Sequence, residues 1–563
     1  MRIVVIGGVA AGMSCATRLR RRMPAAEIVV LERGHYVSFA NCGLPYFIGG
    51  EITAPSDLLL QTPQSLSEGH DLDVRVDSEV TAIDPDGRNV TVHGPDGEYE
   101  LTYDELVLTP GARAVALPIP GIDSSRVHTV RTVDDAEAIV SRARDAERAV
   151  VIGGGFIGVE TAEGLARAGL AVAIVEAGPH VLPPVEDELV PLVHGALSAA
   201  GVAVVENTTV TEIAEGDGEA LVRLSSGDVL GVDLVVLSAG VRPATEVFER
   251  GGVHCDRGAI RVDAHGRTNR EHVWAAGDAV ASVDFVTGAC GPIALAGPAN
   301  RAGRLVADAI ADPATARDIP ASQRTAIVRA GDLTVAMTGA TRRHLDEGSF
   351  FTIHLHPAHH ATYFPGAEGM SIVLHVERGT GRILGAQAAG GAGVDKRVDV
   401  IATAMRGQLT APELMDLDLC YSPPYGAAKD PITMAGLIAD NVLTGQLALW
   451  YAEDIDEVRD SSLLVDVRGR DEYAGGHIAG AVNIPHTQLR SRVHEVAQLA
   501  GGRPVRLYCA SGYRSYLAHT VLAAAGFDSA SLSGGMYTLL AVLGERTADI
   551  ITTETQIETG VAR

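Results

Sequence analysis

The stretch Ile3-Val4-Val5-Ile6-Gly7-Gly8-Val9-Ala10-Ala11-Gly12 decides the fold. A short buried strand from Met1 to Ile6 runs into a glycine-rich loop, and the residues from Met13 to Met23 can form a helix. A second strand from Ile28 to Leu31 ends at Glu32. A glycine loop between a strand and a helix turns backbone N–H groups and the positive helix end toward a pyrophosphate. The stretch therefore predicts a dinucleotide-binding unit.

The same pattern returns between Ala149 and Glu176, around the complete motif Gly153-Gly154-Gly155-Phe156-Ile157-Gly158. Each loop is followed, about 20 residues on, by an acidic residue suited to ribose hydroxyls, Glu32 and Glu176. The first loop departs from the pattern, because Val9 stands where the second glycine would be. Two such units predict two Rossmann-like domains.

The rest of the chain changes its pattern twice. Residues from about 320 to 440 lose the alternation of strand and glycine loop and predict an α+β module. From about Ser461 a new α/β rhythm begins, with Leu463-Leu464-Val465-Asp466-Val467-Arg468 as its first strand. The stretch after about Ala548 is polar and threonine-rich, and predicts a frayed tail.

Composition excludes several classes of protein. The net charge of -26 over 563 residues disfavours nucleic acid and anionic membranes as partners. Six irregularly spaced cysteines fit a reducing compartment rather than a disulfide framework. No apolar run reaches the roughly 18 residues of a membrane span, and the start lacks a plausible signal cleavage site. We therefore expect a cytoplasmic protein.

Cys42 is the first of two cysteines in chemically informative segments, and it lies in Ser38-Phe39-Ala40-Asn41-Cys42-Gly43-Leu44-Pro45-Tyr46. No second cysteine lies nearby, so a substrate must supply the other sulfur of any disulfide exchange. A helix that begins near Gly43 would lower the pKa of this thiol. The remaining cysteines outside the two segments are read as structural: Cys15, Cys255, Cys290 and Cys420.

Cys509 is the second, in Leu507-Tyr508-Cys509-Ala510-Ser511-Gly512-Tyr513-Arg514-Ser515. A small-residue loop of this kind aims successive N–H groups at the sulfur, and Arg514 adds positive charge. The segments Asp466-Val467-Arg468, Glu472 and Gly476 to Ala481 resemble those of rhodaneses, over about residues 456 to 545. Four residues separate Cys509 from Arg514, as in single-domain sulfurtransferases, which implies that Cys509 carries a persulfide.

A wider resemblance covers about residues 1 to 445. Val273-Trp274-Ala275-Ala276-Gly277-Asp278 is similar to the second flavin motif of the pyridine nucleotide–disulfide oxidoreductase family, and Thr109-Pro110-Gly111 and Ser238-Ala239-Gly240 resemble its crossover segments. The Cys42 segment resembles the active site of coenzyme A disulfide reductases.

The resemblance implies an α/β chain with two Rossmann-like dinucleotide-binding domains, an α+β dimerisation domain and a C-terminal α/β rhodanese-like domain. The expected boundaries are 1–110 with 241–320 for FAD, 111–240 for NADH, 321–445 for dimerisation, 446–455 for a linker and 456–563 for the rhodanese-like domain. The dimerisation domain implies a homodimer.

The implied cofactors are FAD on the first loop and NADH on the second. The implied FAD contacts are Gly7, Gly8, Val9, Ala10, Gly12, Glu32, Arg33, Val80, Gly111, Arg131, Gly277 and Asp278. The implied NADH contacts are Gly153, Gly155, Phe156, Ile157, Gly158, Glu160, Glu176 and Gly240. Glu176, with no arginine beside it, would repel a 2′-phosphate and so favours NADH, with NADPH as the open alternative.

The implied substrate is a small-molecule thiol compound: coenzyme A disulfide, or a persulfide or polysulfide. Its implied contacts are Ser14, Arg18, Arg21, Arg22, Ser38, Asn41, Asn300, Tyr425 and Lys429. The resemblance also implies that Tyr363 and Tyr421 reach the partner subunit's thiol, where a phenol can protonate a departing thiolate. The histidines of the segment that precedes Tyr363, His354, His356, His359 and His360, lack a carboxylate or cysteine to complete a metal site, so no metal is expected.

Two rival functions stay open. One is an NADH oxidase or peroxidase with an accessory rhodanese domain. Such enzymes typically carry a histidine in the first glycine loop, where this chain has Ala10 and Ala11, and this absence favours the disulfide or persulfide reductase. The other rival is a redox-sensing electron-transfer flavoprotein in which Cys42 only reports the redox state.

Overall fold

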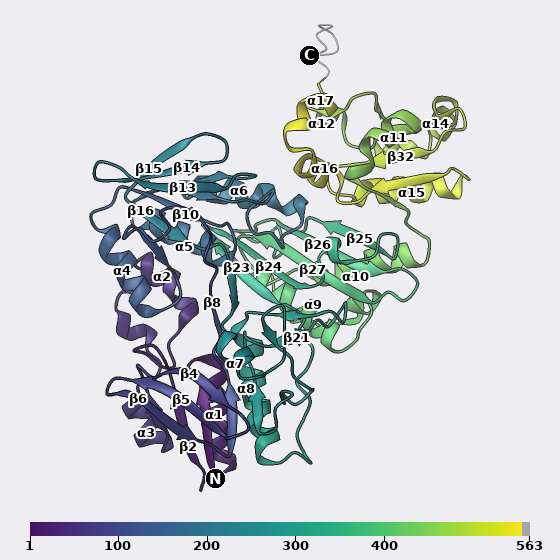
Figure 1. Ribbon diagram of the computed structural model, residues 1–563. Coiled ribbons are helices and arrows are strands. Elements are labelled where there is room, and N and C mark those ends of the chain that lie inside the picture. The colour runs from purple at the N-terminus through teal and green to yellow at the C-terminus, as the bar shows by residue number, and fades with distance from the viewer. Residues whose placement is uncertain (554–563) are drawn as a thin grey trace. The chain divides into compact units, whose positions relative to one another are not determined.

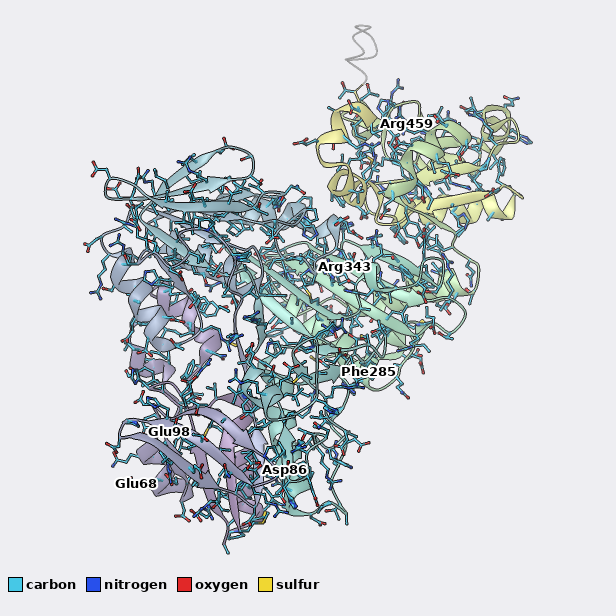
Figure 2. The ribbon with its side chains drawn as sticks, viewed as in Figure 1. Glu68, Asp86, Glu98, Phe285, Arg343 and Arg459 are labelled. Atoms are coloured by element: carbon cyan, nitrogen blue, oxygen red, sulfur yellow. The ribbon has the colours of Figure 1, made fainter. Side chains whose placement is uncertain are left out.

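The computed structural model describes residues 1–553 and contains two compact units (Figure 1). The first unit comprises Met1–Pro183 and Leu197–Arg324, and the second comprises Pro184–Ala196 and the chain from Thr325 onward. Across residues 1–553, none of the helices combines the length and apolar character needed to cross a bilayer. Much of the acidic charge lies at the surface; Figure 2 shows Glu68, Asp86 and Glu98, all exposed, on the first unit.

The opening stretch forms the centre of a five-stranded parallel sheet. Its order is β20-β7-β1-β2-β3; the strands are β1 (Arg2–Ile6), β2 (Glu27–Leu31), β3 (Asp73–Arg75), β7 (Glu105–Leu108) and β20 (Val273–Ala275). Ile3, Val4 and Val5 are fully buried, which explains the uninterrupted apolar run, because both faces of a parallel sheet are covered. Each such side chain contributes roughly 1.5–3 kcal/mol of burial free energy. Helices α1 (Ala10–Arg22) and α8 (Ala296–Ala311) pack side by side on this sheet (Figure 1).

The second glycine motif lies in another five-stranded parallel sheet, of order β12-β11-β10-β16-β9. Its strands are β9 (Val127–Thr129), β10 (Arg148–Ile152), β11 (Ala171–Val175), β12 (Val202–Val205) and β16 (Leu234–Leu237). Helices α4 (Val133–Ala143), α5 (Phe156–Arg167) and α6 (Val190–Ala199) belong to the same stretch of chain. The two expected crossover segments lead into paired antiparallel strands, β8 (Ala112–Ala114) and β17 (Val241–Pro243). The chain thus passes twice between the two sheets.

Smaller elements complete the first unit. They are the antiparallel sheet β4 (Glu79–Asp84), β5 (Asn89–Gly94) and β6 (Gly97–Thr102), the antiparallel sheet β13 (Val210–Glu215), β14 (Ala220–Leu224) and β15 (Val229–Val232), the pairs β18 (Cys255–Asp256) with β19 (Ala259–Ile260) and β21 (Ala281–Val283) with β22 (Cys290–Pro292), and the helices α2 (Leu44–Ile48), α3 (Pro63–His70) and α7 (Glu246–Arg250).

The second unit begins with the expected α+β module, a five-stranded antiparallel sheet of order β23-β24-β27-β26-β25. The strands are β23 (Ala326–Ala330), β24 (Leu333–Gly339), β25 (Phe350–Leu355), β26 (Met370–Glu377) and β27 (Ile383–Gly390), and the helices are α9 (Val394–Arg406) and α10 (Pro431–Leu443). Every residue of β27 is buried, because the strand lies between two neighbours and is covered on both faces. The predicted α/β class with a separate α+β module is confirmed.

The C-terminal domain is a parallel sheet of order β28-β33-β32-β29-β31. The strands are β28 (Leu449–Trp450), β29 (Leu463–Asp466), β31 (Val482–Asn483), β32 (Val505–Tyr508) and β33 (Ser529–Leu532). The helices are α11 (Ile455–Ser461), α12 (Arg470–Ala474), α13 (His486–Leu489), α14 (Val493–Ala500), α15 (Tyr513–Ala524), α16 (Gly535–Leu543) and α17 (Thr547–Ile550). The edge strand β28 lies inside the stretch expected as a linker, so this sheet begins earlier than the sequence rhythm indicated.

The expectation of a frayed tail after about Ala548 is wrong for its first residues. Helix α17 continues to Ile550, and β34 (Ile551–Thr552) pairs antiparallel with β30 (His477–Ile478). Ile550 is buried in the core of the C-terminal domain, which holds the segment in place. Residues 554–563 lie outside the described residues.

Buried histidines join the antiparallel-sheet domain to the C-terminal domain within the second unit. His354 on β25 places Nδ1 2.8 Å from Ser533 Oγ and Nε2 2.6 Å from Glu188 Oε1. His356 places Nε2 2.8 Å from Thr538 Oγ1 on α16. Burial lowers the pKa of His356 to about 4, so it is neutral. Two of the four histidines considered for a metal site, His354 and His356, therefore serve as hydrogen-bonding partners between domains.

Glu188 is the charged centre of this contact. Burial alone would raise its pKa, but the hydrogen bond with His354 and the charge of Arg342 hold the pKa at about 2. Arg342 contacts both Glu188 and Glu453, and so extends the network toward the C-terminal domain.

His354→Phe is expected to lower the free energy of unfolding by about 2 kcal/mol more than the matched change His356→Phe. Only the first change removes a hydrogen-bond partner from the buried carboxylate of Glu188. Glu188 has a depressed pKa, so its contribution is present above about pH 4.5 and is lost as the pH falls toward about 2. The cost of His354→Phe, measured against the wild type, should therefore shrink over that range. Urea unfolding at pH 7 and pH 4 measures it, and equal costs at pH 7 would contradict the prediction.

Candidate active site

The first glycine loop requires glycine at two places. A Cβ at Gly7, whose φ is +101°, would lie 2.1 Å from Thr109 O, and one at Gly12 would lie 1.8 Å from Gly7 O. Helix α1 begins at Ala10, three residues earlier than the sequence indicated, so Gly12 lies within its first turn. The loop is therefore shorter and tighter than expected.

The second loop repeats this geometry and explains why Val9 is tolerated. A Cβ at Gly158 would lie 1.9 Å from Gly153 O. Gly155 precedes α5 as Val9 precedes α1, and a Cβ at Gly155 meets nothing within 4 Å. Because both residues also have negative φ, a valine fits the position without strain.

The two predicted acidic residues face their loops in the same way. Glu32 accepts hydrogen bonds from Gly8 N at 2.7 Å and Gly34 N at 2.9 Å. Glu176 accepts from Gly154 N and Gly178 N, both at 2.7 Å. Each carboxylate thus lies beside the loop whose nucleotide it was expected to bind.

One cavity collects most of the residues expected to bind FAD. It is lined by Gly7, Gly8, Val9, Ala10, Glu32, Arg33, Gly111, Arg131, Gly277 and Asp278, together with Asn41 of the Cys42 segment. Gly12 and Val80 are not among them, because Gly12 lies against the backbone of Gly7 and Val80 is buried in a core cluster. Burial raises the pKa of Asp278, and Arg131 opposes that rise. A glycine cradle, a carboxylate beside it, and the half-buried charges of Arg131 and Asp278 fit a dinucleotide such as FAD.

Cys42 lies beside this cavity, in a single turn (Asn41–Gly43) before α2. Its thiol is exposed, 3.9 Å from Asn41 Oδ1. Partial desolvation raises the pKa of the Cys42 thiol, and the negative charges of Glu160 and Asp278 raise it further. The positive charge of Arg131 acts in the opposite direction. The helix start near Gly43 was predicted correctly, but the net pKa is raised, because α2 has only five residues and two carboxylates act on the sulfur.

Glu160 links the thiol segment to the second dinucleotide motif. It lies in the first two turns of α5, and accepts a hydrogen bond from Tyr46 Oη at 2.9 Å. Helices α2 and α5 approach closely because a Cβ at Gly49 would lie 2.9 Å from Gly164 Cα. Tyr46 was not singled out from the sequence, since its partner lies 114 residues away.

The residues expected to bind the substrate nucleotide lie along α1 and α8. Ser14 donates to Asn300 Oδ1 at 3.1 Å, which brings two of them together. Arg18 and Arg22 both pair with Asp308, at 2.7 and 3.5 Å, and Arg21 is exposed. Ser38 adopts φ +49°, a strained conformation for a serine.

In the second unit, the tyrosine segments lie against each other. Tyr363 Oη and Tyr421 Oη are 3.1 Å apart, and both side chains are exposed, as are Tyr425 and Lys429. The hydrogen bond with Tyr421 raises the pKa of Tyr363, so this phenol keeps its proton at neutral pH.

A buried ion pair between Arg397 and Asp430 holds the two tyrosine segments together. Arg397, 1% exposed, donates to Asp430 Oδ2 at 2.7 Å and to His359 O at 2.8 Å. It thereby ties the segment before Tyr363 to the segment after Tyr425.

The Cys509 loop follows β32 and ends at the N-terminus of α15. Gly512 N donates to Cys509 Sγ at 3.2 Å, and the buried Ser515 Oγ lies 3.4 Å from the same sulfur. Arg514 forms two hydrogen bonds with Glu472, at 2.6 and 2.7 Å, and they hold the pKa of Glu472 at about 2. Sequence reasoning missed Ser515, although its place directly after Arg514, on the first turn of the helix, was a usable signal.

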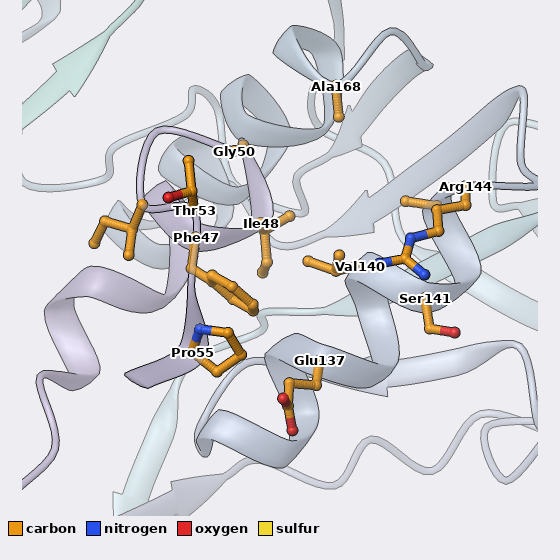
Figure 3. Close-up of a pocket in the computed structure, with 13 residues that line it drawn as sticks. Phe47, Ile48, Gly50, Thr53, Pro55, Glu137, Val140, Ser141, Arg144 and Ala168 are labelled. Atoms are coloured by element: carbon orange, nitrogen blue, oxygen red, sulfur yellow. The ribbon is translucent and has the colours of Figure 1, made fainter. Parts of the chain in front are cut away.

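A second hollow in the first unit contains none of the predicted site residues. It is lined by the end of α2, the turn that follows it and one side of α4, with Phe47, Ile48, Pro55, Val140 and Arg144 among its side chains (Figure 3). We assign it no role in the chemistry.

Comparison with known proteins agrees with this arrangement. Residues 1–299 match the family model of the pyridine nucleotide-disulphide oxidoreductases, residues 325–430 match the dimerisation domain of that family, and residues 448–541 match the rhodanese-like domain. The chain belongs to the pyridine nucleotide-disulphide oxidoreductase family, as the sequence motifs predicted. Membership implies FAD and a nicotinamide nucleotide as cofactors.

Two curated relatives lack the C-terminal extension. The coenzyme A disulfide reductase of Staphylococcus haemolyticus is 31% identical over 440 residues, covering 77% of this chain and 98% of that protein. An NADH oxidase of Methanocaldococcus jannaschii is 30% identical, with the same coverage.

Two solved structures resemble the chain over nearly its whole length. The reduced CoADR-RHD of Bacillus anthracis is 38% identical, with a TM-score of 0.94 and coverage of 98% of this chain and 99% of that one. The NAD-dependent persulfide reductase of A. fulgidus is 34% identical, with a TM-score of 0.87 and coverage of 96% and 100%.

Proposed function

We propose that this chain uses NADH to reduce coenzyme A disulfide or a coenzyme A-like persulfide or polysulfide at Cys42, and that Cys509 carries sulfane sulfur. The carrying observation is a lone exposed thiol beside a dinucleotide cavity, under the charges of Asp278 and Arg131, which line that cavity. The likeness to a coenzyme A disulfide reductase and to a persulfide reductase supports this substrate class.

The overall reactions balance in electrons and protons. A disulfide RSSR with NADH and H⁺ gives two RSH and NAD⁺; a persulfide RSSH gives RSH, H₂S and NAD⁺. FAD, bound in the cavity, would accept two electrons from NADH and make them available at Cys42. Cys42 attacks one sulfur of the substrate, which forms a mixed disulfide and releases the other half as a thiolate. The two electrons from NADH, passed on at the FAD site, would then cleave the mixed disulfide, which frees the second thiol and restores Cys42.

The remaining site residues bind and protonate. Ser14, Ser38, Asn41 and Asn300 contact the substrate, and Arg18, Arg21 and Arg22 meet its phosphates. Tyr363 and Tyr421 of the partner subunit, whose hydroxyls lie 3.1 Å apart, donate a hydrogen bond or proton to the departing thiolate. Tyr425 and Lys429 bind substrate from the same side. The enzyme is therefore a homodimer, and its free cysteines suit the cytoplasm.

The alternative function with a specific observation in its support is an NADH oxidase, because one relative carries that name. The first glycine loop of this chain presents Ala10 and Ala11, which offer oxygen or peroxide no acid–base group, and this weighs against the rival.

The test is anaerobic NADH oxidation by the FAD-loaded enzyme with coenzyme A disulfide, coenzyme A persulfide and hydrogen peroxide as separate oxidants. The proposal expects turnover with one or both sulfur compounds to exceed turnover with peroxide. Faster peroxide turnover would favour the oxidase or peroxidase. Oxygen is offered in a separate aerobic assay, and no turnover with any of the four oxidants, despite normal cofactor binding, would favour an electron-transfer role.

A further inference from the structure

A buried polar seam joins β33 to α15 inside the C-terminal domain. Ser529 and Ser531 occupy alternate positions of β33, and Ser515 and His519 lie one turn apart on α15. Ser531 Oγ donates to Ser515 Oγ at 2.8 Å, and His519 Nδ1 lies 2.9 Å from Ser529 Oγ. The four side chains are 0–5% exposed. Buried polar groups are costly unless paired, so the seam is a built feature of the domain.

Of these four residues, Ser515 is the one whose side chain contacts the sulfur of Cys509. Ser515 Oγ lies 3.4 Å from Cys509 Sγ and 3.0 Å from Gly512 O. Its single proton therefore has two acceptors within reach. Because Ser531 donates to Ser515, the Ser515 proton is left for one of those two acceptors.

The charge on the sulfur decides between the acceptors. A neutral thiol accepts hydrogen bonds weakly, so the proton then points to Gly512 O. A charged sulfur is a stronger acceptor, and the proton then turns to Cys509 Sγ, where Gly512 N already donates at 3.2 Å. The geometry points to Ser515 as a catalytic hydrogen-bond donor to the Cys509 sulfur, with Ser531 as the residue that positions it. This assignment rests on the sulfur-carrying function proposed above for Cys509.

Sulfur transfer places negative charge on Cys509 Sγ at both ends of the cycle. On loading, the thiolate attacks the sulfane sulfur of a donor RSSH; the Sγ–S bond forms, the R–S–S link breaks and RS⁻ departs. On unloading, an acceptor thiolate attacks the terminal sulfur, the Sγ–S bond breaks and its electron pair returns to Sγ. A donor to Sγ thus makes it a better leaving group and a slightly weaker nucleophile.

The first experiment measures alkylation of Cys509 by iodoacetamide across pH, read from the Cys509 peptide by mass spectrometry in the full-length, FAD-loaded protein. Ser515→Ala is expected to move the pH midpoint up by about one unit, the size of effect that loss of one hydrogen bond to a charge produces. Ser531→Ala should move it by less. Ser529→Ala is the matched control, because it removes a buried serine hydroxyl from the same strand without touching the Ser515 contact, and it should leave the midpoint unchanged.

The second experiment separates loading from unloading, in the Cys42→Ser background so that reductase turnover does not consume the sulfur. Cys509 is loaded with coenzyme A persulfide and unloaded with dithiothreitol, at a pH above the midpoints of both proteins. Ser515→Ala should slow unloading about tenfold, while loading stays equal or becomes faster.

Each outcome has a distinct meaning. An unchanged alkylation midpoint in Ser515→Ala, or an equal rise in Ser529→Ala, would overturn the assignment. A loss of loading and unloading alike would indicate structural damage and would also overturn it. Failure of the Cys42→Ser protein to load any sulfur would refute the proposed carrier function of Cys509, while the alkylation midpoints would still report on the hydrogen bond.

Discussion

Cys42→Ser is expected to lower NADH-dependent reduction of coenzyme A disulfide and coenzyme A persulfide by at least about a thousandfold. The thiol is the group in this segment that can form a covalent bond to a substrate sulfur, and a serine hydroxyl at neutral pH does not exchange with disulfides. All six cysteines are free in the structure, so no disulfide-linked partner stands ready to replace it. Anaerobic initial rates with each oxidant measure the loss.

The control is Cys290→Ser, which removes another exposed free cysteine of the first unit, on β22. It should keep wild-type rates. Cys42→Ser itself should still bind FAD, because the cavity is lined by the glycine loop, Glu32 and Asp278 rather than by the thiol. Retained disulfide reduction in Cys42→Ser, with FAD bound, would refute the mechanism and would favour the electron-transfer alternative.

The local part of this site was readable from the sequence. Gly7, Gly12, Gly153 and Gly158 could be recognised because close backbone approach excludes any side chain there, which restricts the sequence directly. The departure at Val9 looked like a weakness of the motif. The structure shows that the position before the helix has open space at Gly155, the equivalent residue of the second loop, so a valine breaks no physical rule.

Contacts between side chains far apart in the sequence could not be predicted from the sequence. Arg18 and Arg22 share Asp308, which is about 290 residues away, and nothing in either helix alone indicates that partner. The raised pKa of Cys42 has the same origin, since Glu160 and Asp278 approach it only through the fold. The four histidines near Tyr363 gave no sign that two of them would hold the C-terminal domain.

The edges of the C-terminal domain were misjudged because their stabilisation is tertiary. Leu449–Trp450 is too short to show a strand pattern, and it becomes a strand by pairing with β33. Ile551–Thr552 likewise pairs with β30, although its surroundings are polar in sequence. A strand of two residues forms only because a neighbouring strand pairs with it, whereas the long apolar runs of the central sheets can be recognised as strands from the sequence alone.

Cys509→Ser is expected to abolish transfer of sulfane sulfur from coenzyme A persulfide to cyanide, by at least about a thousandfold, since the residue that would carry the sulfur is removed. The C-terminal domain should stay folded, because Cys509 is a small buried residue and serine preserves its shape. Thiocyanate formation under anaerobic conditions without NADH measures the reaction. The complementary result is expected from Cys42→Ser, which lacks the reductase thiol but retains the entire Cys509 loop. If instead Cys42→Ser abolished thiocyanate formation and Cys509→Ser did not, Cys42 would be the sulfur carrier. The buried contacts of Cys509 with Gly512 and Ser515 would then be structural.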